Sequence, residues 1–80
     1  MVVQEKADFM NIGTLSMDYK SKCIETAIKN NKNYIVVICD TFDYEDYPVF
    51  AETYEEAIQQ ANEYDKKSMQ EVMGIYNISK

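Results

Sequence analysis

The chain has 80 residues and a net charge of −6, and it contains no histidine, arginine or tryptophan. A chain of this length forms one domain with one modest core, and it lacks the roughly four Cys or His ligands that a structural zinc site needs. Its negative charge disfavours direct binding to nucleic acid or to an anionic membrane. The longest apolar run, residues 34–39, is far below the roughly 20 residues of a membrane span, and no apolar leader follows Met1. We therefore expect a cytoplasmic protein.

The first helix is expected after an irregular start. Residues 1–13 show no clear hydrophobic period, so we expect an irregular or partly disordered N-terminal segment, followed by a single domain over residues 14–80. Ser16 is a suitable N-cap for a helix over residues 17–30. Helical spacing places five side chains on one buried stripe: Tyr19, Cys23, Ile24, Ala27 and Ile28.

Two strands follow this helix. Residues 34–39 form a short, continuous, β-branched run, which predicts a central strand buried on both faces. Residues 40–46 are polar and acidic and predict a hairpin loop or an extension of the strand edge. Residues 47–51 predict the second strand. Because Pro48 lacks a backbone donor, this strand should lie at a sheet edge, or Pro48 should sit at its start.

A second helix and a third strand complete the predicted fold. Thr53 and Glu56 have the spacing of a capping box, with the helix running to about residue 66. Residues 71–78 predict a third strand, in which Gly74 marks a bulge or a close contact. The prediction is an α+β domain of order α-β-β-α-β, with two helices and a three-stranded sheet of order 2-1-3, in which the helical crossover makes strand three parallel to strand two. If both helices cover one face, the other face is apolar and needs a cover. Either the N-terminal helix provides it or a second copy of the chain does, and the small core favours the homodimer.

The chain shows no catalytic or metal-binding motif. Cys23 and Cys39 are expected to be core cysteines, and no histidine is present to activate Cys39 as a nucleophile. A chain this short also has little room for a substrate pocket of about 300 Å³ or more. The acidic loop at residues 40–46 fails the EF-hand calcium pattern, because Phe42 and Tyr44 occupy ligand positions and the glycine is missing. We therefore expect neither an enzyme nor a cofactor or metal site.

The acidic residues are concentrated in the middle of the chain. Residues 33–65 contain nine acidic residues and no lysine. Asp43 and Glu45 alternate with aromatic residues, and in an extended chain they would share one face about 6.6 Å apart, similar to successive backbone phosphates. This pattern predicts a surface that mimics nucleic acid, although the acids could equally serve only to solvate the turn. The predicted partner-binding residues are Asp40, Asp43, Tyr44, Glu45, Asp46 and Tyr47, with Glu52, Glu55 and Glu56 as a flanking acidic patch.

Residues 34–64 resemble small proteins of phages and mobile elements. The resemblance covers Tyr34-Ile-Val-Val-Ile, Pro48-Val-Phe-Ala and Thr53-Tyr-Glu-Glu-Ala-Ile, a hairpin followed by a capped helix. The chain as a whole, small and acidic, is similar to phage anti-defence proteins such as anti-CRISPRs. The resemblance implies occlusion of the DNA-binding or PAM-binding surface of a nuclease in an infected bacterial host, and it assigns no role to any residue.

Two functions follow from these features. The first is an inhibitor that binds a nucleic-acid-binding host protein, such as a CRISPR effector, through the acidic central surface. The alternative is a non-enzymatic homo-oligomeric accessory or regulatory module that holds a small ligand between subunits. In that case four lysines would serve an anionic ligand: Lys20, Lys22, Lys66 and Lys67.

Overall fold

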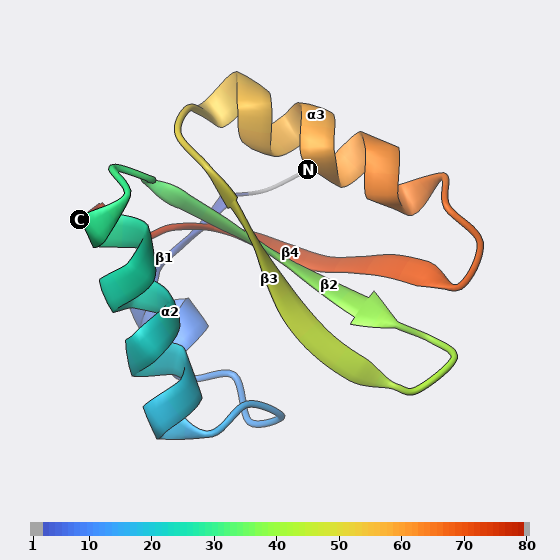
Figure 1. Cartoon of the computed structure of the whole chain (residues 1–80), viewed down its shortest axis with the longest axis horizontal. Coiled ribbons are helices and arrows are strands. Elements are labelled where there is room, and N and C mark those ends of the chain that lie inside the picture. Colours follow the sequence, from blue (N-terminus) through green and yellow to red (C-terminus); the bar gives the residue numbers. More distant parts are fainter. Residues whose placement is uncertain (1–2, 80) are drawn as a thin grey trace.

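The fold is a four-stranded sheet with helices on both faces, seen in a computed structural model that describes residues 3–79 (Figure 1). The α+β class predicted from the sequence is confirmed, with one more strand and one more helix than expected. In chain order the elements are β1 (Val3–Glu5), α1 (Lys6–Met10), α2 (Met17–Lys29), β2 (Tyr34–Asp40), β3 (Glu45–Ala51), α3 (Tyr54–Asp65) and β4 (Gln70–Asn77).

The strand order is β1-β4-β2-β3, with β2 antiparallel to both of its neighbours. The three predicted strands therefore have the expected order, and β3, which contains Pro48, is an edge strand as expected. The other edge is β1, which pairs in parallel with β4. The centre of the sheet is β2 because residues 35–38 are apolar and β-branched throughout, and all four are at most 1% exposed.

The N-terminal segment differs from the irregular structure expected for residues 1–13. The structure places β1 and α1 there, whereas residues 1 and 2 lie outside the described part. Glu5 begins α1 in a capping box with Asp8, whose carboxylate accepts from the Glu5 amide at 3.0 Å. Phe9 is fully buried, and its ring packs edge-on against Tyr76 with centroids 5.6 Å apart. One buried side chain in five helical residues leaves no periodic signal in the sequence.

The helices divide between the two faces of the sheet. In Figure 1 α3 lies above the twisted sheet and α2 lies to its lower left. Phe9 of α1 and the buried side of α2 pack with Ile35 and Val37 of β2, whereas α3 packs with Val36 and Ile38. Both apolar faces of β2 are therefore covered within one chain. An uncovered face was the reason to expect a homodimer, and the structure removes that reason.

Both long helices begin at the predicted caps. The side-chain oxygen of Ser16 accepts from the Tyr19 amide at 3.2 Å, and that of Thr53 accepts from the Glu56 amide at 3.2 Å. The buried face of α3 carries Ala57 and Ala61, whose small side chains allow the helix to lie close to the sheet. On α2 the buried side is narrower than the stripe of apolar residues predicted from the sequence, because Ile28 is 62% exposed.

A bulge in β4 lies where Gly74 predicted one. Val37 pairs with Gly74 and Ile38 pairs with Val72, so Met73 is the extra residue. Gly74 is also a close contact, since a Cβ there would lie 2.9 Å from the Tyr76 hydroxyl. The bulge turns Met73 outward, and its side chain is 52% exposed.

Lys20 joins α1 to α2 from a buried position. It is 5% exposed, and its Nζ donates to the carbonyl oxygens of Met10 and Ile12, each at 2.6 Å. Met10 is the last residue of α1, where a helix leaves acceptors without backbone partners, and Ile12 lies just beyond the C-cap Asn11. Lys20 therefore fixes the N-terminal segment against α2 and is not available to an anionic ligand.

Replacing Lys20 by Met should lower the free energy of unfolding by about 2 kcal/mol, because the apolar stem is kept while the charged donor is lost from two carbonyls. Urea denaturation measures the change. Lys22→Met is the matched control, since Lys22 lies on the exposed side of the same helix and should change stability by less than about 0.5 kcal/mol. Equal stability of the two variants would show that the Lys20 bonds do not stabilise the fold.

Candidate partner-binding surface

The turn between β2 and β3 exposes two aromatic side chains. Phe42 is 72% exposed and Tyr44 is 82% exposed. The turn is ordered by local bonds, since the Asp40 carboxylate accepts from the Phe42 amide at 2.9 Å and the Thr41 amide donates to the carbonyl of Met69 at 2.9 Å. Tyr44 has a φ of 57°, a left-handed conformation that non-glycine residues adopt uncommonly. The aromatic side chains therefore project from a defined backbone.

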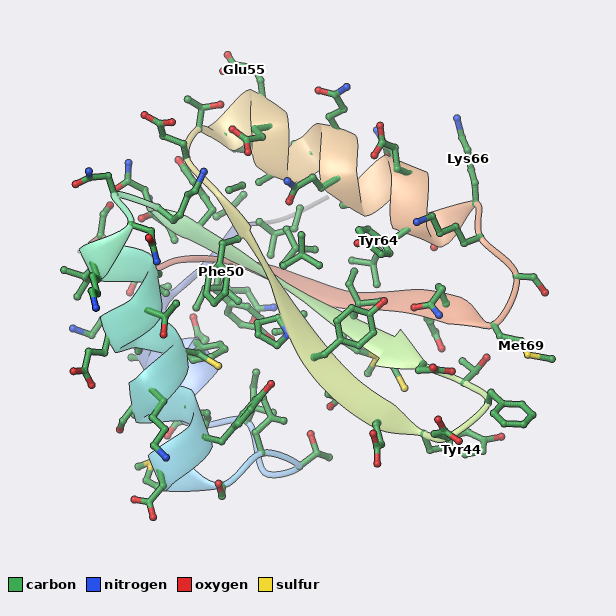
Figure 2. All side chains as sticks on the ribbon, in the orientation of Figure 1. Tyr44, Phe50, Glu55, Tyr64, Lys66 and Met69 are labelled. Carbon is green, nitrogen blue, oxygen red and sulfur yellow. The ribbon has the colours of Figure 1, made fainter. Side chains whose placement is uncertain are left out.

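The predicted contact residues fall into two groups at opposite ends of β3. Asp40, Asp43, Tyr44, Glu45 and Asp46 lie at the hairpin end, which we call the hairpin surface. The flanking acidic patch, Glu52, Glu55 and Glu56, follows the other end of β3 at the start of α3. Seven residues of strand separate them by roughly 20 Å, and the labelled Tyr44 and Glu55 lie on opposite sides of the molecule in Figure 2. One continuous acidic surface is therefore not formed.

The extended conformation assumed for phosphate mimicry by Asp43 and Glu45 is not present. Asp43 lies in the turn and not in extended chain, whereas Glu45 is the first residue of β3. The two carboxylates therefore do not alternate along one strand face as expected. The chain reverses over residues 41–44, inside the acidic stretch 40–46 identified in the sequence, whereas Glu45 and Asp46 already belong to β3.

Tyr47 is half-buried and packs against the core beneath α3. Its ring packs edge-on against Tyr64 with centroids 6.3 Å apart, and its hydroxyl donates to the side-chain oxygen of Gln70. Burial raises the pKa of this hydroxyl. Tyr47 lies beside α3, on the sheet face opposite Asp46, so its half-buried side chain does not share the face of the other predicted contact residues of β3.

A groove opens beneath the hairpin surface on the α2 side of the sheet. Its volume is about 540 Å³, larger than expected for a chain of this size, and it is open to solvent. The loop before α2 forms one wall and the hairpin forms the other. The lining residues are Thr14, Leu15, Ser16, Tyr19, Cys39, Tyr44, Glu45, Asp46 and Met73.

One hydrogen bond joins the two walls of the groove. The Thr14 hydroxyl donates to Oδ2 of Asp46 at 2.7 Å, across 32 residues of sequence. This bond holds the loop against the hairpin and orients the Asp46 carboxylate. Thr14, Leu15 and Tyr19 were not predicted as site residues, because only the folded chain brings them to the hairpin.

Cys39 lies in this groove with a thiol that resists ionisation. Partial burial raises its pKa, and the carboxylates of Asp46, Glu71 and Asp40 raise it further. Both cysteines are free thiols, and Cys23 is buried in the core as expected. Cys39 is only half-buried and is partly a groove residue. A catalytic thiol needs the opposite environment, one that lowers its pKa.

The lysines proposed for an anionic ligand do not form one site. Lys20 is buried against α1, and Nζ of Lys67 lies 4.4 Å from the ring centroid of Tyr64. Lys66 projects away from the body of the protein at the end of α3 (Figure 2).

Within residues 3–79, no group of three or more His, Cys, Asp or Glu side chains is arranged to hold a metal ion. None of the helices in that same range is long and apolar enough to cross a membrane.

Removing the Glu71 charge should make Cys39 more reactive. In Glu71→Gln the thiolate is repelled less, so its pKa should fall and the pH profile of iodoacetamide alkylation should shift to lower pH. Mass spectrometry of the alkylated peptides follows Cys39 separately from Cys23. Glu55→Gln, at the far end of β3, is the matched control and should leave the profile unchanged. An unshifted profile in Glu71→Gln would contradict the negative potential inferred for the groove.

Comparison with known proteins assigns no family or function to the chain. No family model, curated protein or solved structure matches the chain. The functional interpretation therefore depends on the chemistry of the hairpin surface and of the groove beneath it.

Proposed function

We propose that the protein is a non-enzymatic inhibitor that binds a basic surface of a nucleic-acid-binding protein through its hairpin surface. The observation that carries this proposal is the exposure of Phe42 and Tyr44 on an ordered turn among carboxylates. Exposed aromatic side chains on a fixed backbone lose little entropy on binding, and aromatic residues are frequent anchors of protein interfaces.

The charge distribution supports a basic partner. Asp40, Asp43, Glu45 and Asp46 gather around the turn, in a stretch of residues 33–65 that has no lysine. A one-sided field of this kind steers association with an oppositely charged surface and makes it sensitive to salt. The Lys and Arg side chains that a protein uses to contact phosphates are such a surface.

The class of partner can be stated more narrowly as a bacterial nuclease. The resemblance to anti-CRISPRs makes a bacterial nuclease such as a CRISPR effector a suitable partner, in the cytoplasm of an infected host. Carboxylates that cover the nuclease's DNA-binding residues would compete with DNA. The raised pKa of Cys39 supports a binding role over a catalytic one, because this thiol is poorly ionised.

The alternative of a homo-oligomeric module loses its structural support. It was expected from an uncovered apolar sheet face, and four lysines were the residues expected to serve an anionic ligand between subunits. Helices cover both faces of β2, and Lys20 is committed to the carbonyls of Met10 and Ile12.

Reversing two charges at the hairpin should abolish partner capture. Asp43→Lys combined with Glu45→Lys replaces attraction by repulsion, whereas the exposed positions of both residues should leave the fold intact. The tagged proteins are used to capture partners from lysate of the natural host, with stepwise salt elution and mass spectrometry. A nucleic-acid-binding protein should be retained by the wild type, be displaced by added DNA or RNA, and be lost from the double variant.

The matched control reverses the same number of charges at the far end of β3. Glu52→Lys combined with Glu55→Lys should retain the partner, because these residues lie away from the hairpin surface. Urea denaturation verifies that both double variants are folded. Equal capture by the hairpin variant and the wild type, or no displacement by nucleic acid, would refute the proposed function.

A further inference from the structure

We infer that the groove beneath the hairpin is a subsite for one arginine or lysine side chain of the partner protein, an inference that rests on the proposed function. The groove adjoins the hairpin surface, since Tyr44, Glu45 and Asp46 belong to both. A partner segment that contacts the turn is therefore in position to place one side chain in the groove.

The walls of the groove suit a long side chain with an apolar stem. Leu15, Tyr19, Tyr44 and Met73 supply apolar surface, and Tyr19 and Tyr44 offer aromatic rings from opposite walls. Arginine and lysine side chains bury their methylene stems against such surfaces while the charged end contacts a polar group. A guanidinium also stacks on aromatic rings.

The charge of the groove selects a cation. Glu45 and Asp46 line it, Glu71 lies next to Cys39 on β4, and within residues 3–79 the lining contains no lysine. Burial is the main cause of the raised pKa of the Cys39 thiol, and the carboxylates of Asp46, Glu71 and Asp40, which raise this pKa further, also favour a bound cation. An anionic ligand would meet repulsion from each of these groups.

The Asp46 carboxylate is already oriented in the free protein so that it can pair with a cation of the partner. Its carboxylate is held by the Thr14 hydroxyl at 2.7 Å, so its orientation does not need to be fixed on binding. A carboxylate has about four acceptor sites, and the bond from Thr14 occupies one of them. The others can accept from a guanidinium or an ammonium group.

The test is an NMR titration of the ¹⁵N-labelled protein with the peptide acetyl-Gly-Arg-Gly-amide at low salt. Backbone amide shifts should move at Leu15, Tyr19, Cys39 and Asp46. The control peptide has citrulline in place of arginine, which keeps the shape of the side chain and removes its charge. The citrulline peptide should bind at least about fivefold more weakly. Equal binding of the two peptides, or shifts spread over all acidic regions including Glu55, would overturn the inference.

Two groove variants locate the site. Asp46→Asn keeps an acceptor for Thr14 but loses the charge, and Tyr19→Leu keeps an apolar side chain but loses the aromatic ring. Each should weaken binding of the arginine peptide by about two- to fivefold. Glu55→Gln and Tyr54→Leu are the matched controls at the start of α3 and should leave the affinity unchanged. Unchanged affinity in both groove variants would place the peptide elsewhere.

The result separates this inference from the proposed function. If the arginine peptide fails to bind the groove while the hairpin double variant still loses its partner, the subsite is refuted and the proposed function remains. If the peptide binds the groove but no nucleic-acid-binding protein is captured, the subsite is supported and the proposed function fails.

Discussion

The fold depends on the burial of β2 on both faces. Residues 35–38 are four consecutive β-branched residues with almost no exposed surface, and their alternate side chains point to opposite faces of the sheet. A buried strand of this kind requires cover on each side, and the described residues, 3–79, provide α1 and α2 on one side and α3 on the other. The α2 side is covered as far as Val37. Beyond it Cys39 is half-buried and Met73 is exposed, and the groove begins there.

The carboxylates of the groove are not neutralised by Lys20, because this lysine attaches the N-terminal segment to α2. Lys20 is next to Tyr19 in α2, but its Nζ is directed to the carbonyls of Met10 and Ile12. The lysine closest in sequence to the groove residues thus stabilises α1 and does not neutralise the carboxylates of the hairpin. The same loop contributes Thr14, which orients Asp46. The attachment of α1 and the geometry of the groove are therefore linked through residues 10–20.

Local signals in the sequence predicted most of the fold, and contacts between distant segments determined what was missed. The caps at Ser16 and Thr53, the central position of β2 and the bulge near Gly74 each leave a signal within a few residues. The short elements β1 and α1 are defined by pairing with β4 and by the packing of Phe9 on Tyr76, which no local pattern shows. The acidic hairpin was predicted because it is one continuous stretch of sequence. The groove, and the separation of Glu52, Glu55 and Glu56 from the hairpin, were not predicted because they depend on contacts between distant segments.

The pairing of β1 with β4 has a consequence for the order of folding. Val3 lies opposite Ile75, so this contact joins residues 72 positions apart, whereas the β2–β3 hairpin and α3 are built from contacts close in sequence. Contacts between distant residues form slowly because a long loop must close. During synthesis β1 has no strand to pair with until residues 75–77 of β4 have left the ribosome. Until then the α2 face of the sheet lacks Tyr76 and the packing of Phe9, and the newly made chain exposes apolar surface of the kind that makes folding intermediates prone to aggregate.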